Sequence, residues 1–141
     1  MPGRIHPSDG PRPTASEAER TFYRALKEQL PECWTAWHSL RVRGTGNEEG
    51  EGDFVIAIPG RGFVVVEVKG GAVCVQGGRW LQNGSPMDAP PLSQAHKVAR
   101  ALKERLEARH VPARFAVAVA FPDVSFDKPP TEGNLALLLN V

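Results

Sequence analysis

The sequence contains few cysteines and no long apolar run. Cys33 and Cys74 are too few for a disulfide framework, and neither stands at a zinc-ligand spacing from any of the four histidines. No apolar stretch approaches the roughly 18 residues that a membrane-spanning helix needs. The first residues also lack the charged-then-apolar order of a secretory signal. We therefore expect reduced thiols in a cytoplasmic protein.

Neither sign of charge is in excess. Seventeen Lys and Arg residues against sixteen Asp and Glu residues give a formal net charge of +1. Because this balance provides no overall attraction for nucleic acid, such a partner would have to bind a local basic surface. These residues also contain no Gly-Lys-Ser/Thr phosphate loop, which excludes a helicase motor within them.

The hydrophobic patterns predict an α/β fold. A length of 141 residues suffices for one domain with its own core. Residues 1–15, rich in Pro, Gly and Arg, predict a flexible leader, and residues 16–141 predict the folded domain. Helices are expected at 16–30, where Ser16 and Glu19 form a capping box, and at 93–109. The remaining patterns predict strands at 34–42, 53–58, 62–69, 73–75, 79–81, 115–121 and 135–141, with an exposed loop at 43–52. This order favours a central mixed β-sheet flanked by helices.

The strand at 62–69 is apolar but carries two charges near its end. Strand alternation places Glu67 and Lys69 on one face. Taking such charges out of water costs several kcal/mol each, so a central strand keeps them only if they pair or hold a metal. The alternative interpretation is a strand whose last residues have reached solvent.

Asp53 begins the partner strand of the same predicted hairpin. Its carboxylate is therefore expected beside Glu67, with Lys69 close by. Carboxylate oxygens suit Mg²⁺ or Mn²⁺, which activate water and neutralise charge on phosphoryl oxygens. We interpret Asp53 and Glu67 as catalytic metal ligands and Lys69 as the group that orients water or stabilises the transition state.

The turn between these strands determines whether Asp53 and Glu67 share a face. They do so only if the residue numbers of two paired residues, one on each strand, add up to an even number, as 53 and 67 do. A two-residue turn at Gly60-Arg61 would give an odd sum. We therefore expect a three-residue loop or a bulge near Gly60–Gly62, where glycine supplies the positive φ that such loops need.

Three further residues are candidates for the same site. Glu19 lies on the apolar stripe of the first helix, where it either caps the Ser16 amide or joins the active site, whereas Glu17 lies on the solvated face. Gln94 begins the later helix and is interpreted as an active-site residue that contacts a phosphate, although an ordinary polar N-terminal residue would give the same pattern. Lys97, one turn on, would add a phosphate contact.

Several short motifs together resemble the nuclease-related domain (NERD) family of the PD-(D/E)xK, restriction-endonuclease-like superfamily. The resemblance covers about 16–124, and its motifs are Ser-Glu-Ala-Glu-Arg at 16–20, Gly50-Glu51-Gly52-Asp53-Phe54, Glu67-Val68-Lys69-Gly70-Gly71, Gly78-Arg79-Trp80 and Gln94. It implies a restriction-endonuclease-like core and a Mg²⁺-dependent nuclease that hydrolyses nucleic acid, with DNA as the expected substrate. Asp53, Glu67 and Lys69 match the catalytic signature, but Gly52 replaces the proline expected before the acidic residue.

The resemblance also implies a helicase or another nucleic-acid-processing module as partner or fused domain. Two alternatives to an active nuclease are open at this point. The first is a catalytically inactive binding or docking module, which would keep the same fold. The three charged residues could instead form a buried ion-pair network. That arrangement predicts tight direct pairing with no room for a metal.

Overall fold

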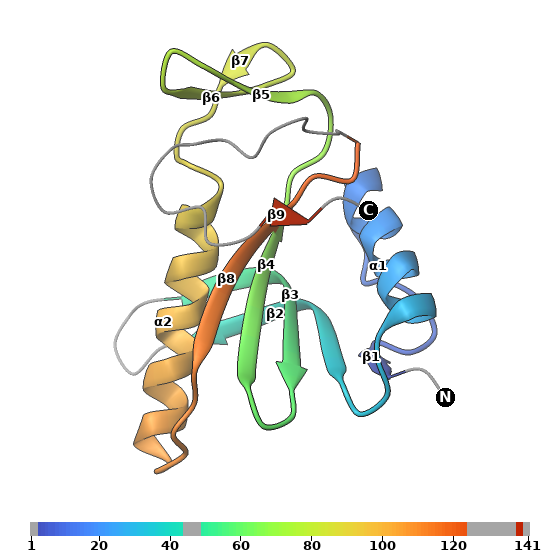
Figure 1. Ribbon diagram of the computed structural model, residues 1–141, viewed down its shortest axis with the longest axis vertical. Helices are drawn as coiled ribbons and strands as arrows, with labels where there is room; N and C mark the ends of the chain where they lie inside the picture. The colour runs from blue at the N-terminus through green and yellow to red at the C-terminus, as the bar shows by residue number, and fades with distance from the viewer. Residues whose placement is uncertain (1–2, 44–48, 124–137, 140–141) are drawn as a thin grey trace.

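The computed structural model describes residues 3–43, 49–123 and 138–139 (Figure 1). The elements in chain order are β1 (Arg4–His6), α1 (Glu17–Gln29), β2 (Thr35–Arg43), β3 (Glu49–Ile58), β4 (Gly62–Val68), β5 (Val73–Gln76), β6 (Arg79–Gln82), β7 (Ser85–Pro86), α2 (Leu92–Ala108), β8 (Phe115–Ala120) and β9 (Leu138–Leu139). Within the described residues, no helix is long and apolar enough to cross a membrane.

The main sheet is mixed and has a helix on each face. Its strand order is β1-β2-β3-β4-β8-β9, and β5, β6 and β7 form a second, smaller sheet. β2, β3 and β4 are antiparallel neighbours, whereas β1 lies parallel to β2 and β8 lies parallel to both β4 and β9. In Figure 1, α1 and α2 lie on opposite sides of the main sheet and the small sheet lies beyond one end of it. The predicted α/β architecture is confirmed.

Alternation along the strands produces two hydrophobic cores. Phe54 and Val66 pack with Phe22 of α1 on one face, and Val55 and Val65 pack with α2 on the other. Because Val65 faces α2, the next residue but one, Glu67, faces α2 as well. The fold thereby directs a buried carboxylate toward the second helix.

The turn between β3 and β4 is the three-residue loop that the sequence predicted. Ile58 pairs with Gly62, which leaves Pro59, Gly60 and Arg61 in the loop. The Arg61 amide donates to the Ile58 carbonyl at 3.0 Å, and Gly60 has φ 75°. The pairing of Phe54 with Val66 continues this even register toward Asp53 and Glu67.

Gly62 should be the least replaceable residue of this turn. It has φ 126°, and a Cβ there would stand 2.3 Å from the Arg114 carbonyl oxygen, which already accepts the Phe63 amide. We expect Gly62→Ala to lower the free energy of unfolding by on the order of 3 kcal/mol. Gly60→Ala is the matched control, since a Cβ there meets nothing within 4 Å, and it should cost about 1 kcal/mol. Equal midpoints in urea denaturation would contradict this account.

Two segments differ from the sequence-based expectation. Residues 4–6, expected in a flexible leader, form β1, because Ile5 packs into the α1-face core and is only 6% exposed. The wider division into 1–15 and 16–141 stays a prediction.

The expected loop at 43–52 is wrong in its last part, since β3 begins at Glu49. Both Gly50 and Gly52 in this strand are buried. A Cβ at Gly52 would lie 3.1 Å from Val98 Cγ1, so glycine lets α2 pack directly on the strand. The rest of that loop, 44–48, lies outside the described residues, as does the predicted strand at 135–141 apart from β9.

Candidate active site

A kink in β2 and β3 places Asp53. His38 stacks on Phe54 in the α1-face core, yet Leu40 packs on the α2 face, so the alternation reverses between them. Ser39 has φ 55° at this point. His38 pairs with Phe54 and Leu40 pairs with Gly52, but Ser39 and Asp53 between them do not pair. The Asp53 side chain is thereby released from the ordinary up-and-down alternation of the strand.

The backbone of β4 holds the Asp53 side chain in the plane of the sheet. Its Oδ2 accepts a hydrogen bond from the Val68 amide at 2.8 Å, just beyond the last pair between the strands, Phe54 with Val66. A strand amide points within the plane of the sheet toward the neighbouring strand. The carboxylate therefore occupies the place of a ladder carbonyl, at the end of β4.

Glu67 and Lys69 complete the group at the end of β4. Glu67 is buried, with 6% of the residue exposed, and Lys69 Nζ lies 3.3 Å from its Oε1. The Lys69 side chain is 30% exposed, so its ammonium can contact both Glu67 and solvent. The structure thus brings together Asp53, Glu67 and Lys69 as the sequence analysis expected.

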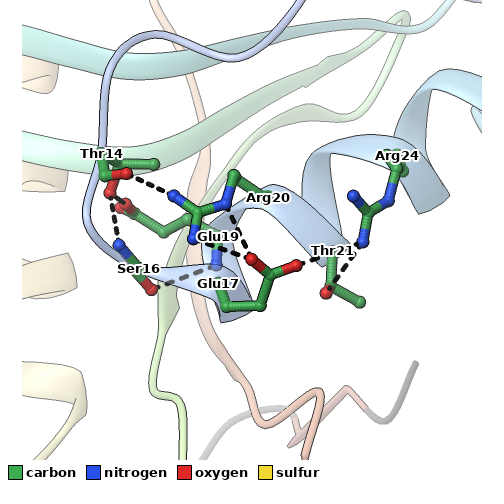
Figure 2. A network of polar contacts seen from close by, with 7 residues as sticks. All are labelled: Thr14, Ser16, Glu17, Glu19, Arg20, Thr21 and Arg24. Atoms are coloured by element: carbon green, nitrogen blue, oxygen red, sulfur yellow. Dashed lines mark hydrogen bonds and ion pairs between the residues drawn. The ribbon is translucent and has the colours of Figure 1, made fainter.

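Glu19 approaches the same group from α1, where its carboxylate interacts with Asp53. Ser16 Oγ accepts the Glu19 amide at 3.2 Å, as in a capping box, but the Glu19 carboxylate does not return a bond to the Ser16 amide (Figure 2). The Ser16 amide instead donates to Thr14 Oγ1 at 3.1 Å, and the Thr14 hydroxyl donates to the Glu19 carboxylate. That carboxylate also shares a hydrogen bond with Asp53. Glu17 is exposed, as expected, and pairs with Arg20 at 2.7 Å.

Gly70 explains how α1 can come so close. A Cβ at Gly70 would stand 2.8 Å from the Cβ of Ala18, the residue before Glu19. Only glycine therefore lets the first turn of α1 pack directly after β4. The glycine that follows the Glu-Val-Lys segment serves this approach.

The carboxylates destabilise one another's charges. Burial, the Glu67 charge and the contact with Glu19 together raise the pKa of Asp53 to about 8, against the lowering effect of the Val68 amide. Burial also raises the pKa of Glu67, although Lys69 and the bond to Asp53 oppose this shift. Three carboxylates face one ammonium, so a self-balanced ion-pair network does not describe the group. Neutralising it requires protons or a cation.

The group opens into a pocket of about 590 Å³. Its lining residues are Glu67 and Lys69 at the end of β4, Gln82 of β6, residues 86–91, and Ser93, Gln94 and Lys97 of α2. Gln94 Nε2 donates to the Glu51 carbonyl at 3.2 Å, which fixes the amide against β3, whereas Lys97 is exposed. Four of the six predicted site residues therefore line one pocket.

A larger pocket formed by the described residues does not contain these ionisable groups. It measures about 780 Å³ and lies at the other end of the hairpin, around 57–63 and 111–114, with no carboxylate in its lining. The candidate site is distinguished instead by the convergence of Asp53, Glu67 and Lys69, with burial raising the pKa of both carboxyl groups.

Sequence reasoning missed two residues near the site. Thr14 stands two residues before the helix cap, a spacing at which a hydroxyl can serve the first turn, but its sequence neighbours give no reason to connect it with Asp53. His38 is 1% exposed, accepts the Arg12 amide at Nδ1 (3.0 Å), and has its pKa lowered by burial. Its Nε2 has no partner among the described residues.

The oxygen donors suit one kind of metal better than others. Within the described ranges, no group of three or more His, Cys, Asp or Glu side chains is arranged to hold a metal. Zinc sites usually take at least three such ligands, whereas Mg²⁺ is commonly bound by one or two carboxylates, with water and substrate phosphate completing its coordination. Asp53 and Glu67 fit the second pattern.

The mixed sheet, the two covering helices and the acidic end of β4 are consistent with a restriction-endonuclease-like core. The family model described as "nuclease-related domain" matches residues 14–122, and the chain belongs to this family. No curated protein and no solved structure matches it. Membership associates the chain with nuclease-related chemistry, for which divalent metals are common cofactors.

Proposed function

We propose that this protein is a Mg²⁺- or Mn²⁺-dependent nuclease that hydrolyses phosphodiester bonds of nucleic acid, with DNA as the expected substrate. The observation that carries the proposal is the convergence of Asp53, Glu67 and Lys69 at the end of β4, beside a pocket that Glu67 and Lys69 line together with Gln94 and Lys97. A helicase partner or fused module stays a prediction from the family resemblance.

The backbone carbonyl of Val68 would supply a third oxygen for the metal. The Lys69 amide bonds to the Ala120 carbonyl on the β8 side, and the two polar groups of the peptide between 68 and 69 point in opposite directions. The Val68 carbonyl therefore points toward β3, as does the Val68 amide that Asp53 accepts. Asp53, Glu67 and this carbonyl would hold the ion at the end of β4.

The residues around the ion have separate tasks. A bound divalent ion would lower the pKa of an attacking water and neutralise charge on the phosphate oxygens. Lys69, ion-paired with Glu67 and partly exposed, would orient the attacking water and stabilise the negative charge of the transition state. Glu19 positions Asp53 through their hydrogen bond. Lys97, exposed on α2 at the pocket, contacts a substrate phosphate, and Gln94 supports this side of the site.

A direct test is cleavage of plasmid, linear duplex, single-stranded DNA and RNA by purified protein. We expect cutting in Mg²⁺ or Mn²⁺ and none in a chelator. Binding without metal-dependent cutting of any of these substrates would favour the inactive binding module instead.

Thr14 should act as a positioning residue. Because its hydroxyl holds the Glu19 carboxylate, Thr14→Val should lower metal affinity or cleavage rate by about 10- to 100-fold, as loss of a group that orients a metal ligand does. Thr14→Ser should restore both quantities. Thr21→Val is the matched control in the same helix, since the Thr21 hydroxyl accepts a hydrogen bond from Arg24 at the surface (Figure 2). If Thr14→Val titrates metal and cleaves like Thr21→Val, Glu19 has no part in the site.

A further inference from the structure

The loop 86–90 separates two hollows. On one side is the pocket that contains Glu67 and Lys69, and on the other is a smaller hollow of about 220 Å³. Pro86–Pro90 lines both, and the rest of the small hollow is formed by Gly78, Arg79 and Trp80. The Gly78-Arg79-Trp80 motif, which the proposed chemistry does not use, therefore lies one loop away from the proposed metal site.

Trp80 is a rigid aromatic surface in this hollow. Its ring stacks on Phe121 with 5.8 Å between centroids and 6° between planes, and Phe121 is fully buried. The Met87 amide donates to the Trp80 carbonyl at 3.0 Å, so the separating loop is fixed to the residue that forms the hollow. The indole is only partly buried. An aromatic ligand would find a platform that costs little ordering to bind.

The charges in the hollow fit a base better than a phosphate. Arg79 is exposed, and its side chain has no partner among the described residues. Asp88 lies in the shared loop, where its carboxylate would repel a phosphate but can accept an N–H group of a nucleobase. A guanidinium beside an indole adds stacking and cation–π contact.

We propose that the hollow formed by Arg79, Trp80 and Asp88 binds an unpaired base of the substrate strand next to the phosphate that is cut. The inference rests on the proposed nuclease function and extends it to a substrate class. A base that is paired in a duplex cannot enter a hollow and stack on Trp80, so single strands and frayed ends are the preferred substrates.

The test is a binding cycle between one base and one side chain. Binding of a labelled single-stranded DNA is measured in Ca²⁺, beside oligonucleotides in which one base at a time is replaced by an abasic site. We expect Trp80→Leu to weaken binding roughly 5- to 100-fold, with Trp80→Phe near wild type. An abasic site at one position of the DNA should weaken binding to the wild-type protein by a similar factor. The same abasic site should not weaken binding to Trp80→Leu any further. Arg79→Ala should also weaken binding, and Arg109→Ala, an exposed arginine at the end of α2, should not.

Because Trp80 packs on Phe121, thermal melting of each variant is recorded, and Trp80→Phe keeps the packing while testing the platform. The inference is overturned if every abasic position weakens wild type and Trp80→Leu equally, or if duplex DNA binds wild type as tightly as single-stranded DNA. A wild-type protein that neither binds nor cuts any nucleic acid would overturn the proposed function itself. Wild-type cutting with no effect at Trp80 would overturn the base site alone.

Discussion

Asp53→Asn is expected to abolish metal-dependent cleavage, whereas Lys69→Ala should retain the metal and lose mainly rate. Asparagine can still accept a hydrogen bond from the Val68 amide, so the local structure is preserved. The negative charge that the Asp53 carboxylate would offer to the metal is lost. Glu67→Gln should behave in the same way. Removing Lys69 takes away one transition-state contact, which typically costs on the order of 10²- to 10³-fold in rate.

Cleavage rates and metal titration on the same preparations measure this difference. Glu17→Gln is the control, because Glu17 is an exposed carboxylate two residues from Glu19 that pairs with the surface residues Arg20 and Arg24. A contaminating nuclease would cut equally in all preparations. Wild type and Asp53→Asn with equal metal-dependent rates would exclude Asp53 as a ligand.

Metal should stabilise the protein more strongly as the pH rises toward 8. The pKa of Asp53 is raised to about 8, so the folded state keeps a proton that the unfolded chain releases near pH 4. The metal-free protein therefore loses stability as the pH rises between these values. A metal replaces that proton, and at 100 times its dissociation constant it should add about 2.7 kcal/mol, or roughly 5 to 10 °C in melting temperature.

Melting curves at pH 6 and pH 8.5, with and without Mg²⁺ or Mn²⁺, test this linkage. Without metal, Asp53→Asn should melt above wild type at pH 8.5, because the buried charge is gone, and added metal should no longer raise its melting temperature. If the metal raises the melting temperature equally at both pH values, Asp53 is not a metal ligand. A less stable Asp53→Asn protein at pH 8.5 would contradict the electrostatic account of the site.

Features that depend on neighbouring residues could be predicted from the sequence. The cap of α1 at Ser16 and the two short strands β5 and β6 follow from side-chain and backbone preferences over a few residues. The even register of β3 and β4 follows from the loop at Gly60, although the position of the Asp53 side chain also depends on the kink at Ser39. The charged residues that end an apolar strand were enough to predict that Asp53, Glu67 and Lys69 lie together.

Features that join distant segments were decided by tertiary packing. The sequence did not predict β1, because one isoleucine in a polar segment gains its stability only by burial against α1. It did not predict the kink at Ser39 that turns Asp53 toward Val68, or the Thr14 hydroxyl that holds Glu19. Nor did it predict that Gln94 would be tied to Glu51, or that Trp80 would both pack on Phe121 and line a hollow. Local preference acts over a few residues, whereas these contacts exist only once the two helices have packed on the sheet.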